Sequence, residues 1–330
     1  MTLQPIFNYK ILLKSLINRK SSDNRVLIKS GRLAFNYIIS VIKEKTMINN
    51  IILPNLICDE VVDVIRSHNI KIKYYNIDNC LKYDINEIER LAIDQNNIIM
   101  FVNYFGFVQH HSISEKIKNN FIIEDNAHVL KKTKNHMINT DIDYSFTSLR
   151  KLLPVLSGAE IYSNKHRLKF KSSVRFPDLG EIKYSLRGLK NSRSGTSKMG
   201  HSVSNINYRL SSIDAFSKNI INNYSFDYSD ITNKRRKNFM FWEKYLSNHD
   251  VTFLKTIENE PEICPYAFPC YVDDKIQQEK WIKWGRMHNI TVIEWPKYHK
   301  TTLNSVPDNF LRHILLFPVN HQFDLDKIIG

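Results

Sequence analysis

The stretch Asn120-Phe-Ile-Ile-Glu-Asp-Asn-Ala-His128 carries the pattern on which the expected fold rests. Its apolar first part ends directly in two carboxylates, which is typical of a buried strand whose carboxyl end opens into a site. A carboxylate there is costly unless a cation or hydrogen-bond donors meet it. Asp125 is therefore a candidate functional residue, although spacing alone predicts a helix-cap or turn aspartate equally well.

Apolar segments of strand length alternate with amphipathic segments of helix length on both sides of this stretch. The expected strands are residues 50–54, 70–77, 97–105, 120–124, 143–149 and 159–163, and the expected helices are residues 31–42, 60–67 (capped by Asp59) and 85–93. This alternation predicts an α/β fold with a mostly parallel sheet and flanking helices. Ligands of such sheets bind at the carboxyl ends of the strands.

The rest of the chain has a different pattern. Residues 166–204 are polar and nearly without periodicity, so we expect a long, mobile excursion there. The elements expected beyond it are helices 208–221, 229–246 and 275–287 and strands 266–272, 291–295 and 314–317. This order predicts a large domain over residues 1–240 and a smaller C-terminal α+β domain over residues 241–330.

Composition limits the possible classes of protein. The 330 residues are 42% hydrophobic and 24% charged, which is typical of a globular protein large enough for two domains. The sequence shows neither a signal peptide nor an apolar run of membrane-spanning length, so we expect a cytoplasmic protein without a membrane partner. The four cysteines lack C-x-x-C spacing, and we expect no metal site.

The net charge of +14 suits nucleic acid, an anionic small substrate, or simply a lysine-rich composition. The sequence contains no zinc finger or RNP-type motif, and its lysines and arginines are spread along the whole chain. We therefore do not expect nucleic acid as a partner.

Three further positions with useful chemistry stand at the ends of expected elements. Lys151 ends the strand-like segment 143–151, yet a lysine in so basic a chain is most simply a solvated charge. His128 follows Asp125 by three residues and is either packed over a ring or a surface turn residue. Ser30-Gly31-Arg32 opens a helix and suits an anion, although Ser-Gly before a helix is also ordinary capping.

Taken in order, eight segments between about residues 25 and 325 resemble motifs of the DegT/DnrJ-type aminotransferases. These are pyridoxal-phosphate (PLP) enzymes that aminate keto-sugars on nucleotide carriers. The most specific segment is Ile123-Glu-Asp-Asn-Ala-His128, which is similar to the family's Glu-Asp-x-Ala-His/Gln signature. The others are Ser30–Ala34, Leu53–Cys58, Asn103–Gly106, Ser148–Lys151, Asn207–Ser211, Arg235–Phe239 and Leu316–Val319. The resemblance implies the aspartate-aminotransferase-like PLP fold (fold type I) and a homodimer with shared active sites.

The resemblance also implies a role for each matching residue. Asp125 would pair with the pyridinium nitrogen, His128 would lie beside the ring, and Lys151 would form the Schiff base and shuttle the substrate proton. The remaining residues would hold the phosphate or face the ring. They are Gly31, Arg32, Ser145 or Ser148, Cys58 and, reaching the neighbouring subunit's phosphate, Asn207 or Arg209.

Three positions depart from the family pattern: Cys58 replaces a frequent aromatic residue, Asn103 the usual histidine, and Ser157-Gly158-Ala159 the usual Gly-Gly. The implied function is ping-pong amino transfer from an amino acid, with glutamate as the expected donor, to a nucleotide-linked keto-sugar in surface-polysaccharide biosynthesis. The alternatives are other PLP chemistry, such as dehydration or transamination of a non-sugar, and a non-catalytic homologue. Lys151 argues against dehydration, and Lys151 with Asp125 argues against loss of catalysis.

Overall fold

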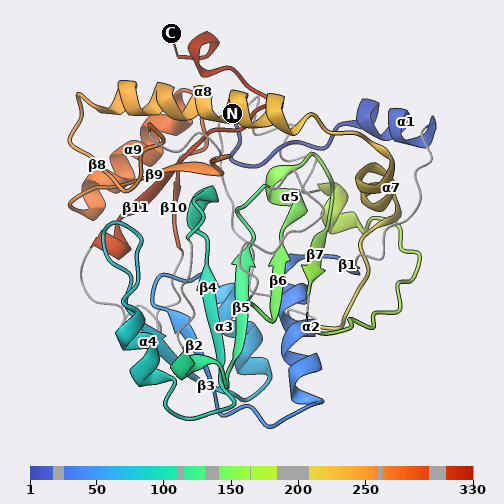
Figure 1. The fold of residues 1–330 in the computed structure, drawn as a ribbon. Helices are drawn as coiled ribbons and strands as arrows, with labels where there is room; N and C mark the ends of the chain where they lie inside the picture. Colours follow the sequence, from blue (N-terminus) through green and yellow to red (C-terminus); the bar gives the residue numbers. More distant parts are fainter. Residues whose placement is uncertain are drawn as a thin grey trace.

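The computed structural model describes residues 1–17, 26–109, 115–130, 141–163, 165–183, 208–258, 263–296 and 310–329. Two sheets organise these residues (Figure 1). The larger has seven strands in the order β1-β7-β6-β5-β4-β2-β3. Its strands are β1 (Val26–Ile28), β2 (Asn50–Pro54), β3 (Lys71–Tyr75), β4 (Ile98–Val102), β5 (Phe121–Asn126), β6 (Tyr144–Thr147) and β7 (Ala159–Tyr162).

The pairing of these strands confirms the predicted α/β class with a mostly parallel sheet. Neighbours from β3 through β6 pair in parallel, whereas β7 is antiparallel to both β6 and β1. The carboxyl ends of β4, β5 and β6 therefore meet at one edge of the sheet. That edge is where the sequence predicted a ligand.

Helices α2 (Gly31–Lys43) and α3 (Asp59–Ser67) lie side by side against one face of the large sheet, and α4 (Ile85–Leu91) leads into β4 (Figure 1). Ser30 caps α2 by accepting a hydrogen bond from Leu33 N at Oγ. One prediction is wrong in detail at α3. Asp59 is the first helical residue, and Cys58 occupies the cap position without a side-chain cap bond.

The expected strands 97–105 and 143–149 end earlier than predicted, because the backbone turns. After β4, Phe105 and Gly106 have φ values of 55° and 96°, a left-handed conformation that no strand accommodates. After β6, the chain forms a single helical turn, α5 (Leu149–Leu152), which carries Lys151. Both turns place the following side chains at the carboxyl edge of the sheet.

The predicted helix 208–221 is also too long. Residues 208–212 run beside β1, since Lys29 N donates to Ser211 O and Ile28 forms a bridge with Ser212. Helix α7 (Ala215–Asn223) starts later and is capped by Asp214. Of the predicted excursion, residues 184–204 lie outside the described residues.

The smaller sheet is antiparallel, in the order β10-β11-β9-β8, which agrees with the predicted C-terminal α+β pattern. Its elements are α8 (Tyr228–Leu246), β8 (Thr252–Phe253), β9 (Ala267–Tyr271), α9 (Lys275–Met287), β10 (Ile293–Glu294) and β11 (Ile314–Pro318). The predicted boundary at residues 240/241 falls inside α8, and one apolar cluster includes residues of both sheets. The division into two domains stays a prediction.

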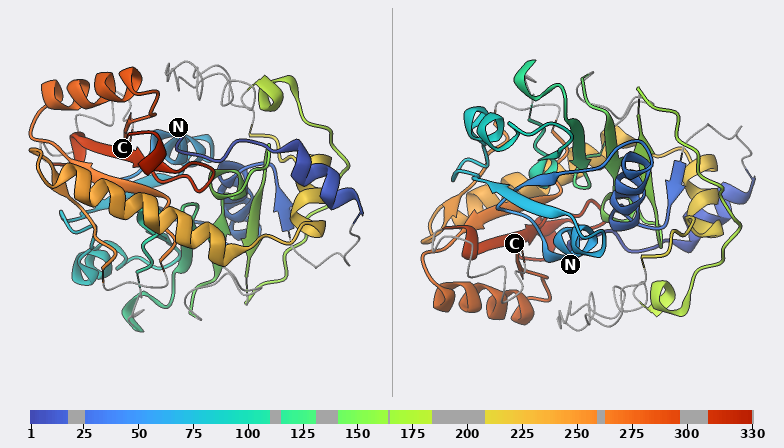
Figure 2. Two further views of the ribbon diagram at one scale, coloured as in Figure 1. Left: turned by 90° about the horizontal axis from the view of Figure 1, so that it is seen from above. Right: turned by 90° about the horizontal axis from the view of Figure 1, so that it is seen from below.

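The N-terminal segment connects the two ends of the molecule. Met1 O accepts a hydrogen bond from Thr291 N beside the small sheet. Helix α1 (Tyr9–Ile17) packs on α7 at the end away from α9 (Figure 2). No helix in the described ranges combines the length and apolar character needed to span a bilayer.

Gly106 fixes the contact between the sheet edge and the C-terminal part. A Cβ on Gly106 would lie 2.3 Å from Cys264 O, and φ is left-handed. We therefore expect Gly106→Ala to lower the free energy of unfolding by about 2 to 4 kcal/mol. The measurement is urea unfolding of the cofactor-free protein.

Gly180→Ala is the matched control. Its Cβ would approach only the Asp178 side chain, at 3.1 Å, and its φ is not left-handed. A change below about 1 kcal/mol is expected there. Equal losses in the two variants would contradict the role assigned to the Gly106 contact.

Candidate active site

The carboxyl edge of the large sheet brings together four residues that the sequence had marked. Asp125 lies near the end of β5, His128 follows it, Lys151 lies on α5, and Cys58 precedes α3. Lys151 Nζ lies 2.9 Å from His128 Nε2. Lys151 is also near enough for its charge to act on the pKa of both Asp125 and Cys58. Segments separated by up to about a hundred residues thus form one site.

The Asp125 carboxylate is buried, with 7% of the residue exposed. Burial raises its pKa, while the charge of Lys151 and the hydrogen bond from Ala127 lower it. Ala127 N donates to Oδ1 at 2.8 Å, which is the bond expected of a turn aspartate. Within the described part of the chain, no hydrogen bond reaches Oδ2. A buried carboxylate with one unused oxygen fits the N–H of a protonated pyridine ring.

His128 is a buried aromatic neighbour of Lys151 rather than a surface turn residue. Its ring stacks on Tyr266 at 4.3 Å and on Phe105 at 5.7 Å, between ring centroids. Burial, and then the charge of Lys151, hold the pKa of His128 well below its usual value. The imidazole is therefore neutral, with one nitrogen that donates and one that accepts. Phe105 N donates to Nδ1 at 3.4 Å, and Nε2 faces Lys151 Nζ.

The rings around His128 were not predicted from the sequence. Tyr266 belongs to the segment before β9, and Trp295 lies 4.9 Å from Phe105 and 5.9 Å from His128, between centroids. Neither has a local pattern that marks it, because each reaches the site through the packing of the C-terminal part. The left-handed φ of Phe105 also has no sequence signal of its own.

The start of α2 is a candidate anion site, and it lies close to Ser148, which precedes the turn that carries Lys151. The Ser30 cap leaves the backbone N–H groups of Gly31 and Arg32 without a partner among the described residues. Gly31 packs next to Ser148, since a Cβ on Gly31 would lie 3.6 Å from Ser148 Cβ. Helix-start amides and a neighbouring hydroxyl are the donors that a phosphate group requires. Arg32 itself pairs with Glu60 at 2.7 Å.

Ser145 lies apart from this anion site. It is in register with Glu124 and Tyr162, whereas the next residue, Phe146, stacks on Phe35 of α2. Because side chains alternate along a strand, Ser145 points to the sheet face opposite α2. Of the two serines proposed for the phosphate, the geometry favours Ser148.

Three other predicted site residues have different positions. Asn207 lies outside the described residues. Arg209 is exposed on the stretch that runs beside α2, where Asn36 Nδ2 donates to the Tyr208 carbonyl. Burial, and then the charge of Glu60, raise the pKa of Cys58 to about 11, so its thiol is protonated and serves as an apolar surface.

Comparison with known proteins gives a structural relationship only. No family model and no curated protein matches the sequence. The fold is similar to that of Spr1654 from Streptococcus pneumoniae in its PLP form, which is named a sugar aminotransferase: the TM-score is 0.68 and the identity 13%, over 99% of this chain and 95% of that one.

Two further solved structures resemble the chain in the same way. PseC from Helicobacter pylori, an aminotransferase involved in pseudoaminic acid biosynthesis, gives a TM-score of 0.65 at 13% identity, covering 98% of this chain and 95% of that one. The sugar aminotransferase CalS13 from Micromonospora echinospora gives a TM-score of 0.63 at 12% identity, covering 98% of this chain and 96% of that one. These similarities confirm the predicted aspartate-aminotransferase-like fold.

The lowered pKa of His128 makes folding depend on pH. Below about pH 6.5 the unfolded chain takes up a proton on this histidine and the folded protein does not. The free energy of unfolding of the cofactor-free protein therefore decreases as the pH is lowered below this value, by about 1.4 kcal/mol per pH unit from this residue alone. We expect His128→Gln to remove that dependence between about pH 5 and 6.5, as measured by urea unfolding at a series of pH values.

His249→Gln provides the control, because His249 is exposed and lies outside the site. Its pH profile should match that of the wild type. A wild-type slope retained in His128→Gln would show that His128 is not neutral in the folded protein.

Proposed function

We propose that this chain is a PLP-dependent aminotransferase. The observation that carries the proposal is the convergence of Lys151, Asp125 and the start of α2 at one sheet edge, in a fold shared with solved sugar aminotransferases. PLP, when bound, supplies an aldehyde that carries the amino group and a ring that withdraws electrons from the reacting carbon.

Each residue has a task in this proposal. Lys151 Nζ would form the covalent link to the cofactor and, once the donor's amine has replaced it, would accept the proton that leaves the donor's α-carbon. Asp125 Oδ2 would accept the N–H of the pyridine ring, while Oδ1 accepts from Ala127 N. His128, neutral and fixed between two rings, orients Lys151 Nζ at 2.9 Å.

The cofactor's remaining contacts come from elements around this centre. The N–H groups of Gly31 and Arg32 and the Ser148 hydroxyl would bind the phosphate. Cys58 offers an apolar contact to the ring. Asn207 or Arg209 of a second copy completes the phosphate site.

We propose that the acceptor is a nucleotide-linked keto-sugar and the donor an amino acid, glutamate being the expected one. In the first half-reaction of a ping-pong cycle, the donor would leave its nitrogen on the bound cofactor and depart as the corresponding keto acid. The keto-sugar would take that nitrogen in the second half-reaction. The names of the similar structures and the net charge of +14 support an anionic sugar substrate. The reaction would serve surface-polysaccharide biosynthesis in the cytoplasm.

A homodimer follows from the same proposal, and exposed apolar side chains support it. Leu13 and Leu16 on α1 are 56% and 61% exposed, and Val174 is 86% exposed. The two leucines and Val174 flank α7. Helix α1 packs on α7, and Phe176, two residues after Val174, contacts Phe216 of α7. An apolar surface of this kind on one end of a molecule is typical of a protein interface.

The cofactor proposal predicts colour. Purified protein with added PLP should show the yellow absorption band of a lysine-bound cofactor, and glutamate should bleach it. Lys151→Ala should lack the covalent band, whereas Lys43→Ala, which changes a lysine on the outer surface of α2, should keep it. The measurement is an absorption spectrum with and without the amino acid.

A wild type that stays colourless with PLP would overturn the aminotransferase assignment. A yellow protein that responds to no amino acid would instead favour other PLP chemistry over amino transfer.

The dimer proposal predicts twice the chain mass by light scattering. Leu13→Glu and Val174→Glu should each shift the protein toward the monomer, because a charge buried in an apolar interface is unfavourable. Ile93→Glu, at a residue 79% exposed beyond α4, is the control and should stay dimeric. A monomeric wild type would contradict the shared site.

A further inference from the structure

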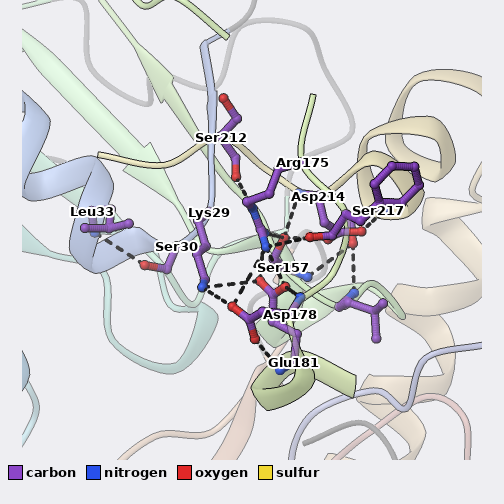
Figure 3. A network of polar contacts seen from close by, with 12 residues as sticks. Lys29, Ser30, Leu33, Ser157, Arg175, Asp178, Glu181, Ser212, Asp214 and Ser217 are labelled. Carbon is purple, nitrogen blue, oxygen red and sulfur yellow. Dashed lines mark hydrogen bonds and ion pairs between the residues drawn. The ribbon is translucent and has the colours of Figure 1, made fainter. Parts of the chain in front are cut away.

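A network of polar side chains connects Arg175 to the segment that follows Lys151 (Figure 3). The Arg175 guanidinium donates to both carboxylate oxygens of Glu181, at 2.7 and 2.8 Å. It also donates to the Ser212 carbonyl at 2.9 Å and to the Ser157 hydroxyl at 3.2 Å. One planar cation thus joins three separate segments of the chain, a geometry that lysine cannot reproduce.

Ser157 lies at the centre of this network and is 3% exposed. Its hydroxyl donates to Asp214 Oδ2 at 2.5 Å and accepts from Asp214 N and from Arg175. Its backbone N–H donates to Ser217 Oγ, as does that of Leu156. The hydroxyl therefore has all its bonding capacity occupied.

The next residue, Gly158, contacts both halves of the proposed cofactor site. Its N–H donates to Lys29 O at 2.8 Å, two residues before Gly31. Its carbonyl accepts from Leu149 N at 2.9 Å, at the start of the helical turn that carries Lys151. A Cβ on Gly158 would lie 2.8 Å from Ile213 Cδ1, and φ is +136°, so a residue with a side chain would be strained at this position.

Charge pairs hold the outer part of the network to the same elements. Lys29 Nζ pairs with Asp178 Oδ2 at 2.5 Å and lies 3.8 Å from Glu181. Residues 173–181 therefore contact the end of β1, the residues before α2 and the turn after α5 at the same time. We call this set of contacts the brace.

We propose that Arg175 and Ser157 are positioning residues, which hold the phosphate-binding turn at Gly31 and the Lys151 helix at a fixed separation. This inference rests on the proposed PLP-dependent function and extends it to the residues that hold the cofactor site in position. A cofactor bound at its phosphate by one element and covalently by another needs that separation to be set before it arrives. Ser157, which belongs to the Ser157-Gly158-Ala159 stretch that departs from the family's Gly-Gly, thereby supplies a hydroxyl to this network.

The test uses Arg175→Met and Ser157→Ala in the full-length protein, with Arg66→Met as the matched control. Among the described residues, the one ion pair of Arg66 is an exposed pair with Asp63 on α3. In the cofactor-free protein, we expect amide hydrogen exchange of residues 149–158 to rise about tenfold in the two test variants only. PLP affinity, followed by the yellow band, should fall about tenfold.

The pH dependence of the yellow band separates positioning from a general loss of stability. A misplaced Lys151 should move the midpoint of that band by about half a pH unit or more, which lower stability alone would not do. Unfolding of each cofactor-free variant in urea is measured in parallel.

Two outcomes overturn the inference in different ways. A yellow wild type together with test variants of unchanged PLP affinity and unchanged midpoint would reject the brace and leave the aminotransferase proposal intact. A wild type that never becomes yellow would reject both.

Discussion

Asp125 is buried at the end of β5, where its surroundings raise the pKa of the carboxyl group. A carboxylate in such a place is stable only when cations or N–H donors reach it. Ala127 N meets one oxygen, and Lys151 contributes a positive charge nearby. The second oxygen fits a cationic ring nitrogen, which gives a physical reason for a cofactor at this edge. The other residues of the site lie around this buried carboxylate, which requires a positive or N–H partner.

The position of Lys151 is the one that local structure fixes least. Lys151 lies on a four-residue helical turn, far too short to be stable in isolation. Its place depends on what holds the turn: Leu149 N bonds to Gly158 O, and Leu153 N bonds to Leu149 O at 2.7 Å. The lysine's position is therefore a property of the tertiary structure. That explains why its sequence neighbourhood alone predicted only a solvated charge.

The sequence predicted best where local pattern decides the outcome. Helix 275–287 and strand 50–54 have the predicted bounds, because periodicity and capping mark them. Prediction failed where the backbone turns or where contacts come from afar. The left-handed φ of Phe105 ended a predicted strand early, and Tyr266 reaches His128 only through packing of the C-terminal part. Asp125 and Lys151 were found by their order among motifs, and their distances came only from the fold.

The departures from the family pattern bear on whether the site is degenerate. Asn103 donates to Glu124 and to Asn126, at 3.2 and 2.6 Å, so its amide lies within a buried polar network of β5. Side chains alternate along β5, which places this network on the face opposite Asp125. Ser157 has a hydroxyl fully bonded within a second network. Both side chains therefore form hydrogen bonds within buried networks, and neither belongs to the cluster of Asp125, His128 and Lys151. If the site were no longer used, we would expect its buried charged residues to be lost first, because a buried charge lowers the stability of the folded protein.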